Sequence, residues 1–292
     1  MATYFKPASE KEQKIVDSIR TQLNGVKLAE DDTSFLINDA LILRYLRHKD
    51  GKEEKALKSI LECVEWRKTT KPYLITFDSV KEWAGEGANY CAGFTKIGIP
   101  IIQLRLVSSR ISSPLTASRN GLGRERTIAQ ASLRSGFPSS NSALVSKDVV
   151  NVTMRVNYVI WALEELMRRG YYESVFIGDF SAFEKSPTDD EKKVREGIDD
   201  VRSRYYPLFE TQTYFVSMPL FLRAIFAVMQ AFMSGAQKEV MHTGLKPKHL
   251  LEWIDASQLP ERLGGTLPVL KKTEGGAEVV DVLAMFPAQR KA

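Results

Sequence analysis

Cysteine and histidine are scarce in this sequence. The two cysteines, Cys63 and Cys91, lack the paired spacing of a disulfide framework or a zinc site. The three histidines, His48, His242 and His249, have no second ligand residue at metal-binding spacing. We therefore expect a protein without disulfides or bound metal, located in the reducing environment of the cytoplasm.

Long apolar runs are also missing. The first residues, MATYFKPASEKEQK, contain no apolar run of the kind that a secretory signal needs. The most apolar stretch, Pro219–Met233, includes Arg223 and Gln230 and is shorter than the roughly 18 to 20 residues that span a bilayer. We therefore expect no integral membrane protein, so that any membrane contact is peripheral.

Recognisable catalytic sequences are absent as well. There is no Walker sequence, no nucleophile elbow and no kinase signature. The run Gly121-Leu122-Gly123-Arg124 resembles the start of a dinucleotide-binding loop, but it has neither a third glycine nor a preceding strand. The net charge of +5 is too modest to predict nucleic-acid binding. These absences predict a protein that is not an enzyme and carries no cofactor.

The first part of the chain, residues 1–72, has the pattern of a helical bundle. In Ser9–Leu23 apolar residues recur every four positions among charged neighbours, which predicts an amphipathic helix. Helical spacing continues in Asp39–Arg47 and Glu53–Lys68, and Pro72 ends the run.

The remainder of the chain alternates short β-branched runs with longer helical ones. Ile99–Val107 and Ser174–Phe180 have the composition of strands, and Asp148–Arg169 keeps helical spacing. A further helix is expected in Pro187–Tyr205, which opens with a proline and carboxylates. Two more strands are expected at Tyr214–Ser217 and Val240–Thr243. The alternation predicts an α/β fold with a mainly parallel sheet covered by helices.

The segment Gln103–Lys147 is rich in serine and carries seven basic residues against one acidic residue, Glu125. Two interpretations stay open. One is a solvated insertion without a partner, because a segment of this composition cannot bury a core. The other is a patch for anionic lipid, to which each basic residue near the surface contributes about 1 kcal/mol. The membrane-docking candidates are Arg119, Arg124, Arg126 and Arg134.

The segment Phe221–Met233 predicts a helix that is apolar around nearly its whole circumference. Such a helix is buried in a core or faces lipid. A third option is a lid between an apolar ligand and a membrane, where the flexible Met229 and Met233 would suit a pliable contact. The residue pattern alone leaves the core helix and the lid open.

A set of longer stretches carries more information than any single helix. In chain order they are LILRYLRHKDGKEEKALKSILECVEWRK, GIPIIQLRL, SVFIGDFS, RYYPLFETQTYFVSMPLFLRAIFAVMQAFM and WIDASQLPERLGG. They resemble, in the same order, the motifs of the CRAL-TRIO lipid-binding family. These motifs are the N-terminal helical motif, the glycine-x-proline strand entry, the central strand ending in aspartate, the tyrosine-proline turn with strand and gate helix, and the closing leucine-proline motif. Members of that family include phosphatidylinositol-transfer, tocopherol-transfer and retinaldehyde-binding proteins.

The resemblance implies a helical region at 1–72, a CRAL-TRIO domain at 73–270 with a basic insertion at about 103–147, and a tail at 271–292. It also implies that the sheet floors an apolar cavity closed by a mobile gate helix, Phe221–Met233. The chain would then hold one lipid or other hydrophobic molecule and exchange it with membranes, since an acyl chain needs an apolar enclosure in water. The expected ligand contacts are Ser174, Phe176, Phe215, Phe221, Leu222, Ile225, Phe226 and Met229.

The likeness departs from the family where the headgroup of the lipid would bind. Relatives that bind phosphatidylinositol have a glutamate and a lysine where this chain has Leu208 and Val240. We therefore expect low affinity for inositol lipid. Ser174 stands where relatives that bind phosphatidylcholine place a serine, whereas Cys91 and Ile102 stand in place of tyrosines. The candidate substitutes for the headgroup contacts are Lys49, Glu210 and Lys238. The sequence leaves the identity of the ligand open among phospholipids, sterols and isoprenoids.

A second class of function also stays open. A protein can keep this fold and dock on a membrane or a protein without transferring lipid, and a cavity filled by side chains would favour that role. We expect Asp179 to anchor the end of a strand, and Arg44 and Arg47 to pack or pair within the helical region. The oligomeric state is not indicated by the sequence.

Overall fold

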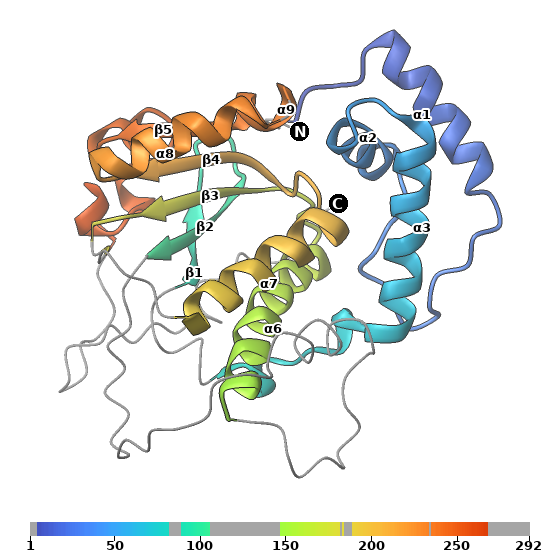
Figure 1. Cartoon of the computed structure of the whole chain (residues 1–292), viewed down its shortest axis with the longest axis horizontal. Helices are drawn as coiled ribbons and strands as arrows, with labels where there is room; N and C mark the ends of the chain where they lie inside the picture. The colour runs from blue at the N-terminus through green and yellow to red at the C-terminus, as the bar shows by residue number, and fades with distance from the viewer. Residues whose placement is uncertain are drawn as a thin grey trace.

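The computed structural model of the chain is shown in Figure 1 and describes residues 5–81, 89–105, 147–181, 183, 189–233 and 235–267. The helices are α1 (Glu10–Gln22), α2 (Asp39–His48), α3 (Glu53–Thr70), α6 (Lys147–Arg168), α7 (Asp189–Tyr205), α8 (Leu220–Ala231) and α9 (Gly235–Val240). The strands are β1 (Asn89–Phe94), β2 (Pro100–Arg105), β3 (Ser174–Asp179), β4 (Glu210–Val216) and β5 (Met241–Leu245). Short 3-10 helices are η1 (Pro72–Leu74), η2 (Phe77–Ser79), η3 (Pro247–Glu252), η4 (Ala256–Gln258) and η5 (Glu261–Leu263). In Figure 1, α1 to α3 lie on one side of the molecule, the sheet lies on the other, and α6 and α7 lie between them.

The three N-terminal helices form the bundle that the sequence predicts. Helix α1 begins at a capping box, in which Ser9 Oγ accepts a hydrogen bond from Glu12 N while the Glu12 carboxylate accepts one from Ser9 N. The apolar faces of the helices meet in a shared core. Its fully buried members include Val16, Ile19, Ile42, Leu46 and Ile60.

Arg47 ties α2 to the start of the chain. Its Nε donates to Glu12 at 2.8 Å, and its terminal nitrogens donate to the backbone oxygens of Lys6 and Pro7 at 2.8 and 2.9 Å. The hydrogen bond from Arg47 lowers the pKa of Glu12 to about 2. Arg47 therefore has the pairing role that the sequence predicts for it.

The sheet has five strands in the order β1-β2-β3-β4-β5. Strands β2 to β5 run parallel, and β1 pairs antiparallel with β2 at one edge. Every residue of the central strand β3 is buried. The predicted α/β fold with a mainly parallel sheet is confirmed, and the predicted helices match α6 and α7 closely.

Three features of the sheet region differ from the sequence prediction. Strand β4 begins at Glu210 rather than at Tyr214, because its first half is polar in sequence yet pairs with β3. Strand β1 and helix α9 were not predicted. In β1, the added Cβ of any other residue at Gly93 would overlap Gln258, whose side chain accepts a hydrogen bond from Phe94 N at 3.1 Å. This strand is therefore shaped by a contact between distant residues, which a local pattern does not reveal.

A buried ion cluster joins the helical bundle to the sheet domain. Arg67 of α3 donates to Asp32 through Nε and Nη2 at 2.5 and 3.0 Å, and to Glu164 of α6 through Nη1 and Nη2 at 2.6 and 2.9 Å. The three side chains are at most 2% exposed. Tyr206 also donates its hydroxyl hydrogen to Glu164, at 2.5 Å. Burial disfavours the charged guanidinium, but the carboxylates outweigh this effect and raise the pKa of Arg67 above its ordinary value.

Replacing Arg67 with methionine should lower the free energy of unfolding by about 3 to 5 kcal/mol, because two carboxylates would stay buried without a compensating cation. Urea unfolding at neutral pH measures the change. The matched control is Arg20→Met, which removes an exposed ion pair with Asp39 and should move the unfolding midpoint little. Equal midpoints for R67M and R20M would show that the cluster does not join the two parts.

Candidate functional site

One face of the sheet carries a row of phenylalanine rings. Successive strand residues point to opposite faces, so Phe176 of β3 lies on one face with Phe180, which follows the strand. The ring of Phe215, from β4, lies 6.4 Å from the ring of Phe176 and 5.7 Å from that of Phe180, measured between centroids. We call Phe176, Phe180 and Phe215 the aromatic wall.

Gly178 makes room for the aromatic wall. It lies between Phe176 and Phe180 in sequence and on the same face of the sheet. A Cβ added at this position would lie 2.6 Å from a ring carbon of Phe215. The ring therefore covers the backbone of β3 directly, and a residue with a side chain at position 178 would push Phe215 away.

The opposite face of β4 is closed by other aromatic residues. Tyr214 is 1% exposed, and its ring stacks on Trp253 at 4.8 Å and on His242 at 5.0 Å. The aromatic wall lies on the other face of the sheet.

Helix α8 covers the aromatic wall and still exposes apolar side chains. Phe226 meets Phe215 with ring centroids 5.0 Å apart, and Phe221 reaches Phe183 at 6.4 Å. Figure 1 shows the helix lying along β4. No residue of α8 is buried. The interpretation as an ordinary core helix is therefore wrong.

The predicted ligand contacts of α8 differ in exposure. Leu222 and Phe226 are half-buried, whereas Phe221, Ile225 and Met229 are exposed. Of the predicted contacts, the structure thus brings Phe226 directly against the aromatic wall. The other exposed apolar residues of this segment are Leu220, Val228 and Phe232.

Ser174 lies at the start of β3, two residues before Phe176 on the same face of the strand. Its backbone N donates to Phe209 O at 2.9 Å, and its backbone O accepts from Thr211 Oγ1 at 3.3 Å. Its own hydroxyl is fully buried and has no hydrogen-bond partner. A buried hydroxyl without a partner is costly, so it marks a place where a polar ligand atom would be favourable.

The three residues predicted to contact the lipid headgroup in place of the family's residues lie on separate elements. Lys49 follows α2, Lys238 is exposed on α9, and Glu210 opens β4. Glu210 already forms an ion pair with Arg202 of α7 at 2.5 Å. The guanidinium of Arg202 also lies 5.1 Å from the ring centroid of Phe176. Sequence reasoning missed this arginine, because the contact joins α7 to two strands and has no local signature.

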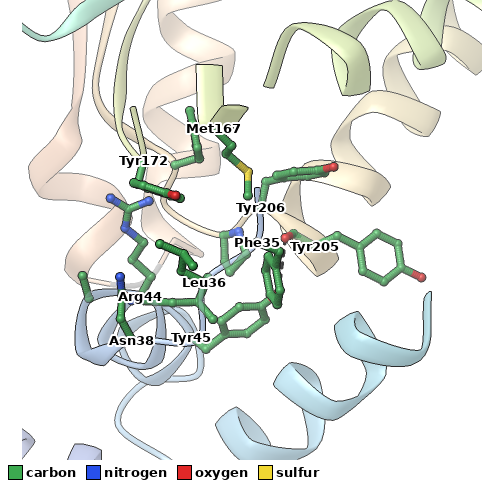
Figure 2. Close-up of a pocket in the computed structure, with 13 residues that line it drawn as sticks. Phe35, Leu36, Asn38, Arg44, Tyr45, Met167, Tyr172, Tyr205 and Tyr206 are labelled. Carbon is green, nitrogen blue, oxygen red and sulfur yellow. Dashed lines mark hydrogen bonds between the residues drawn. The ribbon is translucent and has the colours of Figure 1, made fainter. Parts of the chain in front are cut away.

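A small hollow lies between α2 and the turn before β4, and Figure 2 shows its lining. We call it the α2 pocket. Its volume is about 30 Å³, which is room for about two water molecules and too little for an acyl chain. It is lined by Phe35, Leu36, Asn38, Ala40, Leu41, Arg44, Tyr45, Met167, Tyr172, Tyr205, Tyr206, Pro207 and Phe209. None of the predicted ligand contacts lines it.

Asp179 holds the end of β3, as predicted. Its carboxylate accepts from Ser181 N at 2.9 Å and from Arg262 Nε at 3.1 Å. The ion pair fixes the strand to η5 near the end of the described chain.

The membrane-docking candidates Arg119, Arg124, Arg126 and Arg134 lie outside the described residues, as do most of the basic insertion and the tail. Among the helices that can be described, none is long and apolar enough to cross a bilayer.

Comparisons with known proteins address the family and the fold. Residues 138–265 match the family model of the CRAL/TRIO domain. Among 33 matching chains of solved structures, the one titled "Crystal structure of Sfh5" covers 95% of this chain and 94% of its own, with 12% identity and a TM-score of 0.54. That likeness concerns the fold. No curated protein matches this chain.

The helical bundle and the five-stranded, mainly parallel sheet define the class of the protein as a mixed α/β fold. Within that class, residues 138–265 match the domain model of the CRAL/TRIO family, whose members are lipid-binding and lipid-transfer proteins. The family predicted from the sequence is confirmed.

Replacing Gly178 with alanine should lower the free energy of unfolding by about 1 to 3 kcal/mol, because the new Cβ would overlap the Phe215 ring. Thermal or urea unfolding measures the change. Gly235→Ala is the control, since an added Cβ there meets no atom within 4 Å. If the two substitutions have the same effect, Phe215 does not rest on Gly178 in solution.

Proposed function

We propose that this protein binds one lipid or similar hydrophobic molecule between the aromatic wall and α8, and delivers it to membranes. The main observation in support is the position of α8. Its Phe226 contacts the aromatic wall, and apolar side chains such as Val228 are exposed on its outer side. A helix with apolar side chains on both sides is suited to contact a ligand and a bilayer surface at once.

The energetics favour such an enclosure. Each methylene of an acyl chain exposed to water costs about 0.8 kcal/mol, so a carrier has to cover the chain between membranes. The aromatic wall offers apolar area on the sheet, and α8 offers a cover that no buried side chain holds in place. The membrane contact would be peripheral and on the cytoplasmic side.

The polar end of the ligand is proposed to lie near Ser174. The buried hydroxyl without a partner can donate to a phosphate or carbonyl oxygen of the ligand. The charge of the nearby Glu210 is already balanced by Arg202, which leaves few free charged groups for an inositol phosphate. We therefore favour a phospholipid with a small or zwitterionic headgroup over phosphatidylinositol.

Native and denaturing mass spectrometry with lipid extraction tests the proposal. The purified chain is examined directly and after incubation with liposomes of phosphatidylcholine, phosphatidylinositol and ergosterol. One lipid per chain supports the carrier.

A second candidate is a docking module that does not transfer lipid. It is favoured by the close contact of Phe226 with Phe215, which fills part of the space over the aromatic wall. A chain that stays free of lipid in every incubation would support that module and contradict the carrier.

Replacing Ser174 with alanine should weaken phosphatidylcholine binding about tenfold, which corresponds to the loss of one hydrogen bond of about 1.4 kcal/mol. The stability of the unliganded protein should not fall, because the native hydroxyl makes no hydrogen bond. Competitive uptake from liposomes measures the affinity. Ser203→Ala, at an exposed hydroxyl bonded to Asp200 O, is the control. Unchanged lipid affinity in S174A would show that the Ser174 hydroxyl does not contact the lipid.

Replacing both Val228 and Phe232 with serine should slow lipid exchange with liposomes several-fold while leaving stability nearly unchanged. Both side chains are exposed, at 64% and 87%, so their loss removes apolar area for the bilayer and little from the core. Transfer of a fluorescent phospholipid between two liposome populations measures the rate. The control pair is Leu61→Ser and Leu74→Ser, at exposed apolar residues outside α8. An equal loss of rate in both double variants would contradict a specific role for α8.

A further inference from the structure

Arg44 is a buried cation that the fold leaves without a partner. It is 7% exposed and lines the α2 pocket. Throughout the described part of the chain, no hydrogen bond or ion pair involves its guanidinium, and its Nε is fully enclosed. The guanidinium lies 5.2 Å from the ring centroid of Phe5 and 5.8 Å from that of Phe209. This contrasts with Arg67, whose buried charge is met by two carboxylates.

Three tyrosine hydroxyls of the α2 pocket are already engaged. Tyr45 donates to the backbone oxygen of Tyr205 at 3.2 Å, and Tyr172 donates to Ser34 O at 3.3 Å. The Tyr206 hydroxyl donates to Glu164. Arg44 is the charged donor among the lining residues, and Figure 2 shows it on the side of the pocket where Tyr172 lies.

The pocket also faces the first turns of α2. Asn38 caps this helix of 10 residues by accepting from Leu41 N at 2.9 Å, and Asn38, Ala40, Leu41 and Arg44 all line the hollow. A helix N-terminus carries a partial positive charge that favours anions. The helix end and the buried arginine are independent features, and both favour a negative group at the same place.

Nearby acids compensate the charge of Arg44 only in part. Burial lowers the pKa of Arg44 to about 10, against the opposing effect of Glu173 and Glu210. Glu210 is itself paired with Arg202. An anion in the pocket would therefore stabilise a cation that the protein now holds at a cost.

We propose that the α2 pocket binds a carboxylate anion of the size of formate, held by Arg44 and the N-terminus of α2. The volume of about 30 Å³, room for about two water molecules, excludes an acid with a longer apolar body. The walls are mostly apolar and offer one cation, which suits a singly charged carboxylate better than a phosphate dianion that needs more donors. The site shares no lining residue with the aromatic wall or α8, so it does not depend on the proposed lipid site.

The side-chain Nε–H signal of Arg44 in a ¹⁵N NMR spectrum tests the site directly. The signal is assigned by its loss in Arg44→Met. Titration with formate at constant ionic strength should move it saturably, because Nε gains its first hydrogen-bond partner. The signal of Arg20, which is exposed and bonded to Asp39, is the control in the same spectrum. Formamide, the uncharged analogue, and inorganic phosphate should move the Arg44 signal at least tenfold less.

Thermal unfolding gives a second measurement that needs no Arg44 signal. Formate should raise the Tm of the parent and of Arg20→Met, but not that of Arg44→Met. The R44M protein is expected to fold, because the change removes an unpaired buried charge. Three results would overturn the proposal: no saturable shift of the Arg44 signal with formate, an equal shift with formamide or phosphate, or an equal rise in Tm with formate for R44M.

Discussion

The cation of Arg67 is held between Asp32 and Glu164, and the placement of the remaining elements depends on this cluster. It joins α3 to α6, and through the hydroxyl of Tyr206 it reaches the turn that leads into β4. The adjacent Tyr205 stacks on Trp66 of α3 at 4.0 Å with nearly parallel rings. Because buried charges tolerate little displacement from their partners, the bundle fixes where β4 starts. That turn leads into the strand that carries Phe215 of the aromatic wall, and its residues line the α2 pocket.

The two faces of the sheet differ in how firmly they are covered. Tyr214 is packed between aromatic neighbours on one face, whereas the Phe215 side is covered by a helix without a single buried residue. Removing α8 from the wall would therefore break few contacts. Elements with little burial open at low free energy while the core stays folded, which is the property that a cover over a ligand site requires.

The sequence was sufficient for the elements with strong periodicity and for two of the three rings of the aromatic wall, since Phe180 was not predicted. Strand alternation and the family resemblance together predict that Phe176, Phe215 and Phe226 share a site, and the structure brings their rings together. The α2 pocket and the pair of Arg202 with Glu210 could not be predicted, since each depends on contacts between elements far apart in the chain. The same applies to β1, whose course depends on a distant side chain.

Two buried polar groups without partners lie on either side of Phe209. Ser174 N bonds to the backbone oxygen of Phe209, and the guanidinium of Arg44 lies over its ring. An unsatisfied buried group costs about 1 to 3 kcal/mol, a sizeable fraction of the stability of a domain. Gln103 on β2 is also buried without partners, and the structure gives no physical account of it. Ser174 and Arg44 differ from Gln103 because each lies beside a surface that a ligand can occupy. If a lipid headgroup and a carboxylate bind as proposed, the free energy that the fold gives up at these two positions would be recovered on binding.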